Sequence, residues 1–99
     1  MVITKNVSGE NTTLALQGRL DSSTAPEFEK AIDDTLAGGA KSLVLDFSEL
    51  VYTSSAGLRV ILKAQKAMSK LGGMKLVGVS DDIKEVFDIT GFLDILTLE

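Results

Sequence analysis

Two adjacent serines, Ser54 and Ser55, stand where an apolar run gives way to an amphipathic segment, in the stretch VYTSSAGLRVIL. A helix begins with backbone N–H groups that have no partner inside the helix, and a preceding serine hydroxyl accepts a hydrogen bond from one of them. If Ser54 is this cap, Ser55 is the first helical residue and its hydroxyl is free to face solvent. A phosphate on Ser55 would then lie beside free N–H groups at the positive end of the helix dipole. The pair is interpreted either as a helix cap alone or as a cap followed by a phosphorylation site.

Catalysis at these serines would require a base that takes the hydroxyl proton. The chain has 99 residues with no histidine and no cysteine, so the usual general base and thiolate chemistry are both missing. No G-x-x-x-x-G-K-[ST] loop is present for a nucleotide phosphate. The acidic pairs at 33–34 and 81–82 are interpreted as surface or helix-end charges. We therefore predict no catalytic residue, no metal site and no cofactor, and expect a binding protein that is not an enzyme.

Composition limits the class of protein further. A chain of this length with 44% apolar residues can form one hydrophobic core, but not two. The net charge of −4 argues against nucleic-acid binding, because phosphate backbones attract basic surfaces. No apolar run approaches the roughly 18 residues of a membrane helix, and the first residues lack a signal-peptide pattern. We expect a single cytoplasmic domain over residues 1–99 that neither binds nucleic acid nor inserts into a membrane.

The first part of the chain is predicted to form a hairpin followed by a helix. Residues 2–7 and 13–20 have the composition of strands, and the turn sequence SGEN between them favours antiparallel pairing. The following helix is expected to start at Thr24, which forms a capping box with Glu27, and to stop at the glycine pair 38–39.

The second part is predicted to alternate between strands and helices. Strands are expected at 42–47 and 74–79, with a short helix after Ser80 and a last short strand within 92–96. The apolar run 43–45 is typical of a central strand covered on both faces. Strand–helix alternation implies parallel pairing, and the N-terminal hairpin makes the sheet mixed. The predicted fold is a small α/β domain with helices packed on a mixed sheet.

The helix after the two serines has an apolar face and a basic stripe when it is projected at about 100° per residue. The apolar face, expected to pack on the sheet, comprises Val60, Ile61, Ala64, Ala67, Met68 and Leu71. The basic stripe comprises Arg59, Lys63, Lys66 and Lys70. Leu58 and Leu62 lie beside Ser55, at the edge of the apolar face. They are interpreted either as the edge of the core or as an apolar spot in a protein-binding surface, and the stripe either as a solvated face or as part of that surface.

The segment LDFSELVYTSSAGLRVIL resembles the signature of the STAS domain, and specifically that of bacterial anti-sigma factor antagonists. The likeness extends through nearly the whole chain. It includes GRLD at 18–21, the helix start at 24–25, the glycine pair 72–73 before MKLVGV, and the late DITGF.

The resemblance implies which serine is modified. Aligned on Gly57, the serine that is phosphorylated in the family falls on Ser55, and Ser54 is a second candidate. Ser54 stands where the family has an aspartate, and Ala56 where many members have serine or threonine. Both serine and aspartate cap helices well, so the cap is expected to survive while the carboxylate is lost.

A partner-switching role is what the resemblance implies for function. Such a domain binds an anti-sigma factor that is also an ATP-dependent serine kinase, is released when the kinase phosphorylates the serine, and is reset by a metal-dependent serine phosphatase. The expected partner-binding residues are Asp21, Ser22, Ser54, Ser55, Ala56, Gly57, Leu58, Arg59 and Leu62. The alternative is a STAS subunit with a fixed partner, in a lipid-transport ATPase or a signalling scaffold, that phosphorylation does not regulate.

Overall fold

The structure is a computed structural model that describes residues 1–99. One sheet contains all four strands in the order β1-β2-β3-β4. The strands are β1 (Val2–Ser8), β2 (Asn11–Leu20), β3 (Ser42–Thr53) and β4 (Met74–Val77). The helices are α1 (Ala25–Ala37), α2 (Ser55–Met68), α3 (Asp81–Ile89) and the 3-10 turn η1 (Phe92–Asp94). No helix combines the length and the apolar character needed to cross a bilayer.

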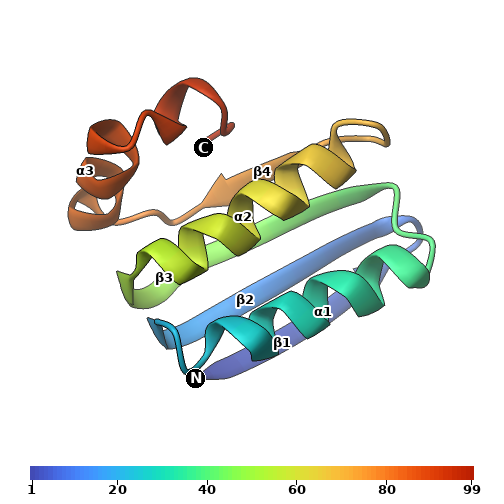
Figure 1. Cartoon of the computed structure of the whole chain (residues 1–99). Helices are drawn as coiled ribbons and strands as arrows, with labels where there is room; N and C mark the ends of the chain where they lie inside the picture. Colours follow the sequence, from blue (N-terminus) through green and yellow to red (C-terminus); the bar gives the residue numbers. More distant parts are fainter.

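The sheet is mixed, as predicted. β1 pairs with β2 in antiparallel orientation, whereas β2 with β3 and β3 with β4 are parallel pairs. Figure 1 shows α1 and α2 side by side on the same face of the sheet, with α3 and η1 beyond β4. The predicted mixed α/β architecture is therefore confirmed.

The core lies between this helix layer and one face of the sheet. Phe28, Phe47 and Phe87 are fully buried there, together with alternate residues of the two central strands. The fully buried strand residues are Leu14, Leu16 and Leu20 of β2, Leu43, Leu45 and Phe47 of β3, and Leu76 of the neighbouring β4. The aliphatic alternation of β2 thus faces the core as its spacing predicts.

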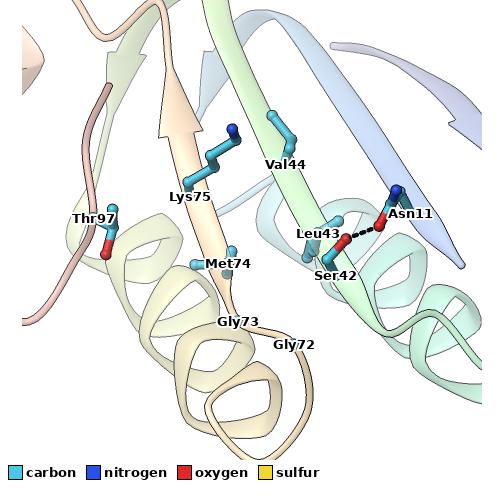
Figure 2. Close-up of a pocket in the computed structure, with 9 residues that line it drawn as sticks. All are labelled: Asn11, Ser42, Leu43, Val44, Gly72, Gly73, Met74, Lys75 and Thr97. Carbon is cyan, nitrogen blue, oxygen red and sulfur yellow. Dashed lines mark hydrogen bonds between the residues drawn. The ribbon is translucent and has the colours of Figure 1, made fainter.

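The other face of the sheet has no helix over it, so the prediction that β3 is covered on both faces is wrong. Val44 of β3 is only half-buried, and Figure 2 shows it beside Lys75 of β4 on this uncovered face. The two crossovers β2-α1-β3 and β3-α2-β4 advance across the sheet in one direction. Crossovers of the same hand that advance in one direction place their helices on the same face.

Several strand assignments also differ from the prediction. β2 begins at Asn11 and not at residue 13, and β4 ends at Val77 and not at residue 79, because the backbone of Gly78 is left-handed with φ of 67°. β3 continues past Phe47 to Thr53, and over this extension it remains paired with β2 through two register shifts. No strand forms at 92–96: η1 occupies this segment, and Leu98 makes a single parallel bridge to Leu76. The left-handed backbone of Gly91, with φ of 79°, turns the chain between α3 and η1.

The one-sided core makes a testable difference between neighbouring residues of β3. Leu45→Ala should lower the free energy of unfolding by about 2–5 kcal/mol, because it leaves a cavity in the packed face. Val44→Ala, the matched control on the uncovered face, should cost about 1 kcal/mol or less. Urea unfolding followed by circular dichroism measures both. Equal losses would contradict a sheet that is packed on one face only.

Candidate functional site

Ser54 caps α2, as its position predicts. Its backbone is extended, and its hydroxyl oxygen accepts a hydrogen bond from the Gly57 N–H at 3.5 Å. The Ser54 N–H donates to the Leu20 carbonyl at 2.9 Å, which ties the start of the helix to the end of β2. Ser54 therefore joins the two elements that position Ser55.

Gly57 allows the first turn of α2 to approach the strands closely. A Cβ atom at this residue would lie 2.5 Å from Leu20 Cγ and 2.8 Å from Thr53 Oγ1. Residues two apart on a helix point about 200° away from each other. The inward orientation of Gly57 thus turns Ser55 toward solvent, and Ser55 is exposed.

The two leucines beside Ser55 have different environments. Leu58 is only 6% exposed and belongs to the core, whereas Leu62 is half-buried. Gly57 and Leu58 therefore lie inside the free domain, and the accessible part of the predicted partner surface is formed by its other members.

The prediction that Leu71 packs in the core is wrong. Leu71 is 44% exposed, because α2 ends at Met68 and Leu71 lies in the following turn.

The basic stripe of α2 divides into a paired and an unpaired part. Lys63 Nζ lies 2.9 Å from Glu29 Oε2 and 3.2 Å from Asp33 Oδ1, both on α1. These carboxylates, Glu29 foremost, raise the pKa of Lys63. Arg59, like Lys66 farther along α2, is exposed and has no carboxylate partner. The prediction from helical spacing did not foresee the link from Lys63 to α1.

The turn between β2 and α1 is organised by Asp21 and not by the predicted capping box. Asp21 Oδ1 accepts hydrogen bonds from Ser23 Oγ at 2.6 Å, from Ser23 N at 3.0 Å and from Thr24 N at 3.2 Å. The Ser23 hydroxyl is the main cause that lowers the pKa of Asp21, whose carboxylate is therefore charged at neutral pH.

Thr24 occupies the cap position of α1 without capping it. Its backbone already has right-handed helical angles, φ −105° and ψ −16°, and its hydroxyl donates to the Arg19 carbonyl at 2.8 Å. The expected reciprocal bonds with Glu27 are therefore absent; the Thr24 N–H donates to the Asp21 carboxylate, and the Ala25 N–H donates to the Asp21 backbone carbonyl at 2.8 Å.

A small groove separates the beginnings of α1 and α2. It has a volume of about 340 Å³ and is lined by Ser22 and Pro26 on one side and by Ala56 and Arg59 on the other. Ser55 lies at this end of α2, so the exposed hydroxyl, the groove and the Asp21 turn share the edge of the sheet where β2 and β3 end.

A second hollow lies on the uncovered face, at the opposite edge of the sheet (Figure 2). Lys75 is its one charged residue, and its ammonium group is paired with the Glu99 carboxylate at 3.2 Å. The polar groups around it are hydroxyls and an amide, with Ser42 hydrogen-bonded to Asn11. It contributes nothing to the edge that carries Ser55.

Comparison with known proteins identifies relatives along the whole chain. A family model described as the STAS domain matches residues 2–99. BtrV of Bordetella bronchiseptica, provisionally named an anti-sigma factor antagonist, is 38% identical over 81% of this chain and 70% of its own length. The anti-sigma-B factor antagonist of Staphylococcus aureus is 29% identical over 92% of this chain and 91% of its own.

Solved structures share the fold at lower identity. An anti-sigma factor antagonist from Mycobacterium paratuberculosis has a TM-score of 0.89 at 23% identity, covering 98% of this chain and 83% of its own. The Bacillus cell fate determinant SpoIIAA in its phosphorylated form has a TM-score of 0.76 at 19% identity, covering 99% and 91%.

The close approach at Gly57 can be tested directly. Gly57→Ala should lower the free energy of unfolding by about 1–2 kcal/mol, because overpacking against Leu20 and Thr53 outweighs the roughly 1 kcal/mol that alanine gains in a helix. Ser55→Ala, two residues away and exposed, should change it by less than about 0.5 kcal/mol. Thermal and urea unfolding measure both. A more stable Gly57→Ala variant would show that the first turn is not tightly packed on the strands.

Proposed function

This chain belongs to the STAS domain family, and we propose that within this family it acts as an anti-sigma factor antagonist that works by partner switching. The unphosphorylated domain binds an anti-sigma factor that is also a serine kinase. The kinase transfers the γ-phosphoryl group of ATP to Ser55 Oγ, releasing ADP, and the complex dissociates. A phosphatase then hydrolyses the phosphoserine and restores the binding form.

The observation that carries the proposal is the exposure of Ser55 as the first residue of α2. The names of the relatives from Bordetella bronchiseptica and Staphylococcus aureus support the antagonist role. The phosphorylated form of SpoIIAA, a protein of the same fold, supports control by a phosphate. Together they favour Ser55 as a substrate hydroxyl over a catalytic one.

Ser55 is a better phosphate acceptor than Ser54. The Ser54 hydroxyl is half-buried and accepts the capping hydrogen bond from Gly57, whereas the Ser55 hydroxyl makes no hydrogen bond within the chain. Phosphoryl transfer to Ser54 would remove a helix cap that contributes about 1 kcal/mol to the stability of the domain. Transfer to Ser55 leaves the cap and the packing at Gly57 in place.

A phosphate on Ser55 would act on the partner more than on the domain itself. The adjacent helix start tolerates an anion, with a stabilisation of about 0.3–1 kcal/mol. Placing close to two negative charges within about 5 Å of a partner's carboxylate costs on the order of a few kcal/mol at surface-like dielectric. Because each 1.4 kcal/mol is about a tenfold loss of affinity, one phosphate is sufficient to release a partner.

Phosphorylation tests the assignment of the serine. Incubation with the cognate kinase and Mg-ATP should add one phosphate to Ser55, located by tandem mass spectrometry of the peptides. Ser55→Ala should abolish the transfer, whereas Ser54→Ala should retain it, because only the cap is lost. A phosphate on another residue, or none, would count against the switch.

The charge mechanism is tested by binding. Ser55→Asp should leave the melting temperature nearly unchanged and weaken binding of the kinase at least about tenfold in calorimetry. Ser8→Asp, which adds the same charge at an exposed position of β1, is the matched control and should bind as the wild type does. Equal affinity of all three proteins would contradict electrostatic release and favour a fixed-partner STAS subunit.

A further inference from the structure

Arg59 is the one free cation close to Ser55. It is exposed, lies four residues after Ser55 on α2, and makes no ion pair or side-chain hydrogen bond within the chain. Residues four apart on a helix are neighbours on its surface, with Cβ atoms about 5–6 Å apart. The guanidinium group can therefore reach an anion carried by residue 55 without any movement of the backbone.

The other cations of this edge are already engaged. Lys63 is held by Glu29 and Asp33 of α1 at 2.9 and 3.2 Å. The Arg19 guanidinium lies 4.2 Å from the centre of the Tyr52 ring, to which it binds as a cation–π pair. Lys66 is eleven residues from Ser55, three turns along the helix. Arg59 is thus the cation that both reaches residue 55 and is free to bind there.

Other groups near Ser55 would both attract and repel a phosphate on its hydroxyl. The N–H groups of Ser55 and Ala56 donate to no group of the chain, so they are available to a phosphate. The charged Asp21 carboxylate lies in the turn joined to Ser54 through the Leu20 carbonyl, and it opposes a second anion nearby. A guanidinium group that binds phosphate through two parallel hydrogen bonds would offset this repulsion.

We propose that Arg59 holds the phosphate of phosphorylated Ser55 in an i,i+4 ion pair and is thereby withdrawn from the groove between α1 and α2. In the unphosphorylated domain Arg59 lines this groove together with Ser22, Pro26 and Ala56, where its charge is available to a carboxylate of the partner. Phosphorylation then adds a negative charge at Ser55 and occupies the free positive charge beside it. This inference rests on the proposed phosphorylation of Ser55.

The test uses the full chain with phosphoserine installed at position 55 during translation, so that no kinase is needed. Titration followed by ³¹P NMR gives the second pKa of the phosphate in the phosphorylated chain with no further substitution, and in its variants Arg59→Gln, Arg59→Lys and Lys66→Gln. An ion pair with Arg59 should make the pKa rise by about 0.5 unit or more in Arg59→Gln, because an adjacent cation favours the dianion. Arg59→Lys should lie between, since a lysine supplies charge without the planar fork. Lys66→Gln removes the same charge farther along α2 and should shift the pKa by about 0.2 unit or less.

Two outcomes would overturn the inference: an unchanged pKa in Arg59→Gln, or equal shifts in Arg59→Gln and Lys66→Gln. Melting curves of the unphosphorylated variants should coincide with that of the wild type, because neither side chain has a partner in the chain, and they serve as the folding control. The result is separable from the proposed function. If the kinase fails to modify Ser55, the proposed function is contradicted but the titration still tests the ion pair. If the pKa of the phosphate is unchanged in Arg59→Gln, the ion pair is contradicted but phosphorylation of Ser55 by the kinase is not.

Discussion

The close contact between the first turn of α2 and the ends of β2 and β3 is the constraint on which the site depends. At Gly57 there is no space for a side chain, since Leu20 and Thr53 fill it. This contact sets the rotation of α2 about its axis, and the rotation decides which residues are buried and which are exposed. Leu58 is buried and Ser55 is exposed for the same geometric reason. Any side chain at residue 57 would therefore alter both the core and the presentation of the hydroxyl.

The parallel arrangement of the central strands brings the polar groups of the site to one edge. β2 ends at Leu20 and β3 ends at Thr53, and these two residues are partners in the sheet. The segments that follow them, the Asp21 turn and the Ser54 cap, are consequently neighbours although they are more than thirty residues apart in the chain. Exposed loops at the carboxyl ends of parallel strands are a common place for binding groups, because the scaffold beneath them is rigid.

Charges along α2 serve two different purposes. Lys63 connects α2 to α1 through ion pairs with two carboxylates, whereas Arg59 has no such partner. Within a chain of net charge −4, Arg59 is an unpaired positive charge four residues after the exposed Ser55. Electrostatic control at this edge thus depends on a few side chains close to residue 55.

Local patterns in the sequence determined most of the elements and the capped start of α2. The alternation in β2, the glycine stop after α1 and the serine before α2 act over a few residues, so each could be interpreted without the rest of the chain. For the same reason Ser54 was predicted as the cap and Ser55 as the exposed neighbour. The glycine pair 72–73 does not end α2, which stops at Met68. Only the tertiary structure decided that one face of β3 is uncovered, that Leu58 belongs to the core, that Thr24 makes no side-chain cap on α1, and that Lys63 is tied to α1. Each of these depends on contacts between residues that are distant in the chain or on a competing hydrogen bond, and spacing along a single helix or strand carries no information about either.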